Sequence, residues 1–146
     1  MFRWLLWRTE RWRYIGRKPM PGASRAFAAA SSAADCVVLT ARGEAARPLT
    51  ERWLRRNLGV VPQLEMRYDR SESSARYKAR RVRELGAVAH IEDDPNTARL
   101  VGPIAQVLLV DWPRNRGLDA PNVVRVQSVA EAGERVRALV SPTESH

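Results

Sequence analysis

The 146-residue chain has few of the residues that build disulfide or zinc scaffolds. Its one cysteine, Cys36, excludes an intramolecular disulfide, and because it lies in an apolar run we expect a small buried side chain. The two histidines are far apart: His90 lies inside an apolar run and His146 is the last residue. One cysteine and two separated histidines exclude a zinc site, and His90 is predicted to be a core residue.

Long apolar runs are also missing. A membrane-spanning helix needs roughly 20 consecutive apolar residues, and no stretch of the chain approaches that length. The amino-terminal run 4–7 is too short for the core of a signal peptide. The chain also lacks a Gly-x-Ser-x-Gly elbow, a Walker-type phosphate loop and a dinucleotide-binding glycine fingerprint. We therefore expect a cytoplasmic protein that makes no membrane contact and belongs to none of these enzyme classes.

Basic residues outnumber acidic ones. The chain has 25 Lys and Arg against 16 Asp and Glu, which gives a formal net charge of +9. Arginine supplies nearly all of the positive charge, and its planar guanidinium matches the geometry of phosphate. This balance favours polyanionic partners such as nucleic acid, nucleotides or an acidic surface, although an arginine-rich genome would produce the same composition.

The composition divides the chain into three parts. Residues 1–18 combine Trp4, Trp7 and Trp12 with a tyrosine and six basic residues. This segment could contain a strand at residues 2–7, form an amphipathic helix or be an arm that packs on another chain. Basic residues between aromatic ones can also bind single-stranded nucleic acid. The tryptophans are best interpreted as core or interface anchors, for a protein partner or a second copy. Residues 19–140 are predicted to form one domain, and residues 141–146 a disordered tail.

Helical patterns and short apolar runs alternate along this domain. Gly59 and Gly86 fit helix carboxyl-terminal caps, and Ser128 with Glu131 has the spacing of a capping box. Short loops between the two kinds of element predict an α/β fold: a Rossmann-like, doubly wound, mainly parallel sheet with helices on both faces. The predicted helices cover 23–34, 48–58, 75–85, 95–100 and the residues after 128, and the predicted strands cover 36–39, 60–66, 87–91, 107–110 and 123–126.

Asp93 and Asp94 follow the predicted strand 87–91 directly. In an open α/β sheet, ligands bind beyond the carboxyl ends of the strands. Paired carboxylates there suit Mg²⁺, which takes oxygen ligands and is often held through one or two carboxylates together with substrate phosphates. The alternative is a turn that caps the next helix, since Asp-Asp-Pro-Asn is ordinary turn chemistry.

Other polar side chains are expected at the same edge. Lys78 lies near the start of a predicted helix, where an ammonium and the positive end of the helix dipole would both favour an anion. A hydroxyl, guanidinium groups, an ammonium and a carboxylate pair together form a phosphate and Mg²⁺ site. The residues placed at this edge by the strand pattern are Thr40, Arg42, Arg67, Asp93, Asp94 and Asp111.

The order of these motifs resembles the haloacid-dehalogenase-like (HAD) phosphatases. That family has a strand ending in Thr or Ser, a downstream Lys and a strand ending in an acidic pair. This chain has residues 37–42 (Val-Val-Leu-Thr-Ala-Arg), then Lys78, then residues 90–94 (His-Ile-Glu-Asp-Asp). Residues 50–54 and 65–67 are similar to the subgroup that contains the phosphatase domain of phage polynucleotide kinase and related nucleotidases.

The resemblance covers roughly residues 19–115 and implies a HAD-like core without a cap domain. It implies that Thr40 and Lys78 contact the transferring phosphoryl group. Asp93 or Asp94 would hold Mg²⁺, and Arg42 and Arg67 would contact the substrate. Such groups act by positioning and electrostatic stabilisation, which dominate phosphoryl transfer.

The chain departs from the family at the first motif. The family carries its nucleophile as Asp-x-Asp-Gly-Thr after a first strand, and this motif does not occur here. Residues 9–15 resemble the segment that follows it, and the nearby acid, Glu10, lies behind the expected position. A nucleophile displaced by about 1 Å can lose about 10²-fold in rate.

Three explanations remain open: a domain that lost covalent catalysis, an altered or truncated phosphatase, or a site completed by another chain. We therefore predict a HAD-like phosphatase-type domain that acts on nucleotide or polynucleotide phosphate monoesters. Alone it should have weak or no phosphatase activity, which would make it a pseudoenzyme. The alternative is a non-catalytic nucleic-acid- or protein-binding module on the same scaffold.

Overall fold

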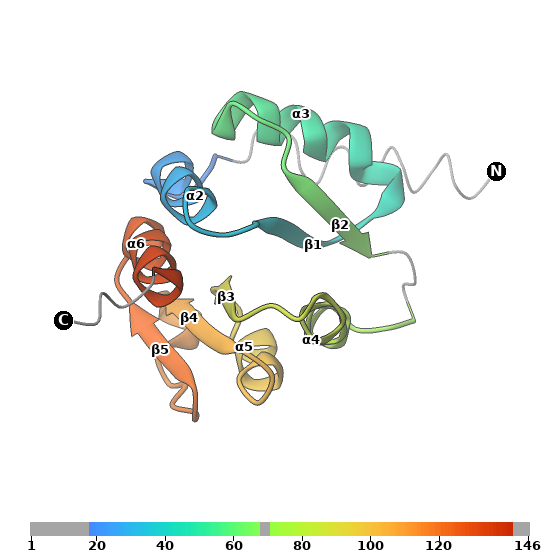
Figure 1. Cartoon of the computed structure of the whole chain (residues 1–146). Coiled ribbons are helices and arrows are strands. Elements are labelled where there is room, and N and C mark those ends of the chain that lie inside the picture. Colours follow the sequence, from blue (N-terminus) through green and yellow to red (C-terminus); the bar gives the residue numbers. More distant parts are fainter. Residues whose placement is uncertain (1–17, 68–70, 142–146) are drawn as a thin grey trace.

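The computed structural model describes residues 18–67 and 71–141, in which helices and strands alternate (Figure 1). The predictions for residues 2–7 and for the tail after Ser141 lie outside these residues. Within them, no helix is long and apolar enough to cross a membrane. The helices are α2 (Ala23–Ser31), α3 (Arg47–Leu58), α4 (Ser74–Leu85), α5 (Pro95–Val101) and α6 (Val129–Val140), and the strands are β1 (Val37–Gly43), β2 (Gln63–Arg67), β3 (Ala89–Glu92), β4 (Gln106–Val110) and β5 (Val123–Val126).

All strand pairs are parallel, as predicted, but the strands form two sheets. β1 pairs with β2, and β3, β4 and β5 pair in that order. The prediction of an α/β protein with alternating helices and parallel strands is therefore confirmed, whereas the single sheet is replaced by sheets of two and three strands. Within the described residues, β1 and β3 each have one edge without a strand partner.

Helices cover both faces of the three-stranded sheet. Alternate residues of β4 point to opposite faces, as pleating requires. Val107 and Leu109 pack into a cluster with α4 and α5, whereas Leu108 and Val110 pack with α2 and α6. Leu39 of β1 packs against the first of these clusters, so the two sheets share part of one core.

The first and last described helices lie against each other (Figure 1). A Cβ atom added to Gly133 of α6 would lie 2.5 Å from the carbonyl oxygen of Ala26 in α2. A Cβ on Gly22 would lie 3.1 Å from the Cβ of Ala130. Because the amino-terminal ends meet and the next turns also meet, α2 and α6 run in the same direction, and Gly133 permits their close approach.

Local signals set the helix ends. Gly59 and Gly86 follow α3 and α4 in the left-handed conformation, with φ of +79° and +64°, where glycine has no Cβ penalty. Ser128 accepts a hydrogen bond from the backbone N–H of Glu131, at 3.0 Å, and so begins α6. The return bond of the predicted capping box is shifted by one residue, because the Glu131 carboxylate accepts from the N–H of Gln127.

The strands differ from their predicted bounds. β1 does not end before Thr40 but continues to Gly43, and its register shifts between those two residues, where Thr40 pairs with Met66 and Gly43 with Arg67. β2 starts at Gln63 rather than at residue 60, because Val60 and Val61 are exposed after the α3 cap. Cys36 precedes β1 and is only half-buried.

Candidate functional site

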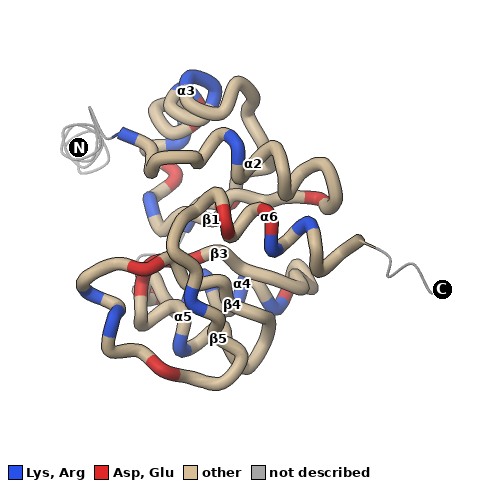
Figure 2. The backbone as a smooth tube through the Cα atoms, turned by 90° about the vertical axis from the view of Figure 1, so that its left-hand side faces the viewer, with Lys and Arg blue, Asp and Glu red and all other residues tan. Residues whose placement is uncertain are grey.

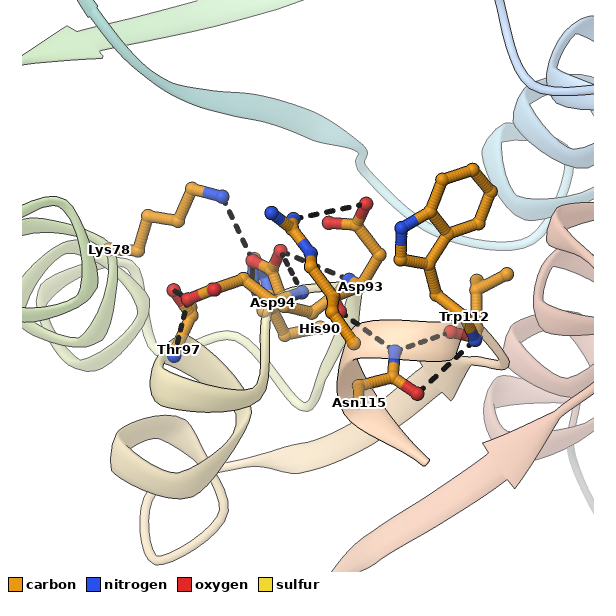
Figure 3. Close-up of polar contacts among 10 residues, drawn as sticks. Lys78, His90, Asp93, Asp94, Thr97, Trp112 and Asn115 are labelled. Atoms are coloured by element: carbon orange, nitrogen blue, oxygen red, sulfur yellow. Dashed lines mark hydrogen bonds and ion pairs between the residues drawn. The ribbon is translucent and has the colours of Figure 1, made fainter. Parts of the chain in front are cut away.

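Glu92, the last residue of β3, is a buried carboxylate in a polar cluster. Figure 3 shows the side chains of this cluster, among them Lys78, His90 and Asp93. Oε2 of Glu92 accepts hydrogen bonds from Nζ of Lys78 and Nε2 of His90, both at 2.9 Å. Its Oε1 accepts from the backbone N–H groups of Asp93 and Asp94, both at 3.1 Å. One side chain therefore holds the lysine of α4 beside the turn that contains the acidic pair.

Glu92 carries its charge despite being buried. Burial alone raises the pKa of a carboxyl group, but the hydrogen bond from His90 and the positive charge of Lys78 outweigh it. The pKa of Glu92 consequently lies well below its ordinary value of 4.5. The side chains of Lys78 and Glu92 are 17% and 4% exposed, so their ion pair is shielded from water.

Asp93 lies at the surface end of this cluster. Its carboxylate is 3.6 Å from Nη2 of Arg114, and its side chain is 38% exposed. Partial burial and the negative charge of Glu92 raise the pKa of Asp93 above its ordinary value, although Arg114 and Lys78 oppose the shift. The side chain is thus accessible to a ligand, and the charges of Glu92, Arg114 and Lys78 act on it.

Asp94 begins α5. Its Oδ2 accepts hydrogen bonds from the backbone N–H of Thr97, at 2.9 Å, and from the Thr97 hydroxyl, at 2.8 Å. This is the helix-capping role considered as the alternative for the acidic pair. One of the two oxygens of Asp94 is occupied in this way, so any further ligand would use Oδ1.

Asn115, a buried residue after β4, joins the ends of two neighbouring strands. Its Nδ2 donates to the carbonyl oxygens of Asp93 and Val110, both at 2.8 Å. Its Oδ1 accepts from the backbone N–H of Trp112 and from Nη1 of Arg125, at 3.2 and 2.7 Å. The edge of the sheet that carries Asp93 is therefore rigidly connected to the loop after β4.

Asp111, also expected at this edge, lies directly after β4. Its Oδ1 is 2.9 Å from Nη1 of Arg125, and its Oδ2 is 3.4 Å from Nε of Arg116. Its carboxylate is neutralised by two arginines, which makes it part of the structural frame of the loop.

The structure places Thr40, Arg42 and Arg67 on the other sheet. Oγ1 of Thr40 accepts from the backbone N–H of Arg42 at 3.2 Å, inside the irregular part of β1. Nη1 of Arg42 donates to Oγ1 of Thr50, at 3.3 Å, and Nη1 of Arg67 donates to the carbonyl of Glu72, at 3.1 Å. Each of these bonds lies within the β1–β2 half of the molecule, so they do not join these residues to the Lys78 and Glu92 cluster.

The sequence pattern did not indicate the roles of Glu92, His90 and Asn115. His90 was expected to be an ordinary core residue, yet it hydrogen-bonds a buried carboxylate. A signal was available for Glu92: an acidic residue at the end of an apolar strand requires a partner when it is buried, and Lys78 is one of only two lysines in the chain.

The metal-binding capacity of the site is limited to oxygen ligands. In residues 18–67 and 71–141 no three His, Cys, Asp or Glu side chains converge as a metal site. Asp93 and the remaining oxygen of Asp94 are oxygen donors of the kind that Mg²⁺ takes, and Mg²⁺ keeps several waters and needs only one or two protein carboxylates. They do not form a complete protein cage for Ca²⁺ or a transition metal.

The chain was compared with protein-family models, with curated proteins and with solved structures, and none of the three comparisons found a match. The fold and the site geometry therefore define this chain as an α/β protein with parallel strands and a buried acid–lysine cluster at a strand end.

Proposed function

We propose that this chain is a HAD-like domain that binds phosphate monoesters of nucleotides or polynucleotides and has weak or no phosphatase activity alone. The observation that carries the proposal is the Lys78–Glu92 ion pair, which holds an ammonium beside the turn containing Asp93 and Asp94. An ammonium and carboxylates at the carboxyl end of a parallel strand are the groups required for a phosphate and its cation.

The roles of the remaining residues follow from the resemblance. Asp93 and Asp94 would hold Mg²⁺, which when bound neutralises phosphate charge. Lys78 would contribute a directed positive charge to the same phosphate, while Glu92 and His90 keep it in place. Thr40 would hydrogen-bond the phosphoryl group, and contacts from Arg42 and Arg67 would require the β1–β2 sheet to approach this edge.

Weak activity is proposed because the sequence has no Asp-x-Asp motif to form a covalent intermediate. Binding needs only the groups that contact the phosphate, whereas covalent catalysis also needs a nucleophile.

A binding assay with a matched control tests the proposal. We expect a nucleoside monophosphate or a 3′-phosphorylated oligonucleotide to bind more tightly with Mg²⁺ than with EDTA. Asp93→Asn should weaken binding in Mg²⁺ about tenfold or more, which is equivalent to about 1.4 kcal/mol of binding free energy. Asp119→Asn, which changes an exposed acid elsewhere, should leave it unchanged.

Phosphate release measured on the same samples separates the remaining outcomes. We expect release near the rate without protein. Mg²⁺-dependent release that Asp93→Asn abolishes would instead identify an active phosphatase. The proposal fails if Mg²⁺ has no effect on binding, or if Asp93→Asn and Asp119→Asn behave alike.

A further inference from the structure

The outward face of α3 carries three arginines. Arg52, Arg55 and Arg56 have the i, i+3 and i+4 spacing that places side chains on one side of a helix, and all three are exposed. The opposite side contains the buried residues Thr50 and Leu54. Figure 2 shows blue segments gathered on α3 at one end of the molecule. We call Arg52, Arg55 and Arg56 the α3 basic face.

No acidic side chain among the described residues pairs with this face. The single acid of α3, Glu51, is 3.6 Å from Nη1 of Arg47, near the start of the helix. Residues 52, 55 and 56 make no ion pair within the described parts of the chain. Their positive charge is therefore available to a partner.

The arginines of α4 provide the contrast. Arg80 lies 2.9 Å from Glu72 and 3.1 Å from Glu84, and Arg81 lies 3.0 Å from Glu65. α4 is as rich in arginine as α3, but acidic neighbours neutralise its central residues. The α3 basic face is thus distinguished by three neighbouring arginines on one side of a helix without a compensating charge, and not by arginine content alone.

We propose that the α3 basic face binds the phosphodiester backbone of a nucleic acid. Guanidinium groups form bidentate hydrogen bonds with phosphate and are only weakly hydrated, so they suit this partner better than ammonium groups do. The three arginines lie within five consecutive residues, about 6 Å along the helix axis, which matches a short run of backbone phosphates. Because such contacts ignore base identity, the binding depends on salt and not on sequence.

The same face does not fit an acidic membrane. A helix that lies on a bilayer inserts its apolar side into the lipid boundary. The apolar side of α3 faces the protein interior, where Leu54 is 4% exposed. Lipid could therefore reach only the arginine side, without the apolar contribution that stabilises membrane binding.

This inference goes beyond the proposed function, since it concerns a surface on the β1–β2 side of the molecule and needs neither Mg²⁺ nor Asp93. It nevertheless fits a polynucleotide monoester as the substrate class. A chain that held the backbone on α3 would retain its nucleic acid even where hydrolysis is slow.

The test measures binding of a fluorescently labelled single-stranded oligonucleotide to the full chain in EDTA, between about 50 and about 200 mM salt. Each phosphate contact to a single strand contributes about −0.7 to the slope of log K against log salt, so three contacts contribute about −2. We expect the triple variant Arg52→Gln, Arg55→Gln, Arg56→Gln to make the slope shallower by about 2. At the lower salt concentration its affinity should fall about tenfold or more.

The matched control removes three exposed arginines elsewhere, as Arg76→Gln, Arg83→Gln, Arg99→Gln. Both triple variants lose the same charge, and glutamine is a good helix former, so circular dichroism should show both folded. We expect the control to change the slope by less than about 1. Equal losses in the two variants would overturn the proposal, because binding would then reflect net charge alone.

Vesicles containing anionic phospholipid should bind far more weakly than the oligonucleotide, and equal binding would overturn the proposal in favour of a membrane partner. The triple variant of the α3 basic face should leave the Mg²⁺-dependent binding of a nucleoside monophosphate unchanged. The proposed phosphate-ester site and the α3 basic face can therefore fail independently of each other.

Discussion

β4 and β1 come from similar apolar runs but have different surroundings. Val107, Leu108, Leu109 and Val110 of β4 are at most 3% exposed, whereas in β1 only Gly43 is buried. β4 lies between two strands and between two layers of helices, and β1 has one strand neighbour in the described part of the chain. The comparison shows that neighbours, and not the apolar run itself, determine how deeply a strand is buried.

Polar contacts follow the same division. The three-stranded half contains the buried Lys78–Glu92 pair, whereas a representative pair of the two-stranded half, Arg47–Glu44, has side chains 35% and 41% exposed. Buried charge pairs are costly to break, and exposed ones contribute little. Stability should therefore be concentrated in the β3–β4–β5 half.

The largest expected effect is in the core of β4. Leu109→Ala should lower the free energy of unfolding by about 2–5 kcal/mol, because it removes a fully buried side chain and leaves a cavity. Leu39→Ala makes the same change in the half-buried β1. It should lower the free energy of unfolding by about half as much or less. Urea denaturation measures both. Equal losses would show that the two sheets are equally well packed.

The next effect concerns the charge pairs. Glu92→Gln leaves Lys78 buried without its counter-ion and should cost about 3 kcal/mol. Glu44→Gln, the counterpart in the other half, should cost less than about 1 kcal/mol. Denaturation at neutral pH measures the difference, and similar values would contradict the contrast between a shielded and an exposed ion pair.

A somewhat smaller effect should follow a change where α2 meets α6. Gly133→Ala places a methyl group where Ala26 already lies, and overpacking of this kind costs about 1–3 kcal/mol. Alanine has a higher helix propensity than glycine, so any loss observed reflects packing and not helix formation. Gly117→Ala is the control, since a Cβ there meets nothing within 4 Å. A neutral result for Gly133→Ala would mean that the helices separate easily.

The smallest effect is in the acid pH range. The pKa of Glu92 is lowered in the folded state. Its ionised side chain therefore contributes fully to stability above pH 4.5, and this contribution is lost as the pH falls toward the pKa of the folded state. The pKa of Asp93 is raised, so the folded state takes up that proton first and gains stability as the pH falls toward 3.8. The two effects have opposite signs and partly cancel.

Unfolding measured in EDTA across this range separates them. Glu92→Gln should flatten the loss of stability in acid, and Asp93→Asn should steepen it. If both substitutions change the dependence of stability on pH in the same direction, the opposite pKa shifts given to Glu92 and Asp93 are wrong.

Helix ends could be predicted from the sequence because they depend on nearby residues. Gly59, Gly86 and Ser128 each act within one turn of the helix that they terminate or begin. Strand partners could not be predicted in this way, since the apolar pattern of β1 does not specify which strands lie beside it. Pairing is a property of residues that are distant in sequence.

The candidate site shows the same limit. Lys78 and the backbone of Asp93 both contact Glu92, because α4 and β3 are consecutive elements. The placement of Thr40 and Arg67 beside them depends on how the two sheets are arranged, which no local pattern encodes. Glu92 itself was missed because its lysine partner, Lys78, lies on the preceding helix.

The contact between α2 and α6 links elements from nearly opposite ends of the chain, and it has a consequence for synthesis. Gly133 cannot meet Ala26 until α6 has left the ribosome. Before that moment, Ala30 of α2 and Leu108 of β4 lack the helix that buries them with Val136. The nascent protein therefore completes this part of its fold only after α6 has been synthesised, and a premature stop before Ser128 would expose apolar residues that chaperones or proteases recognise.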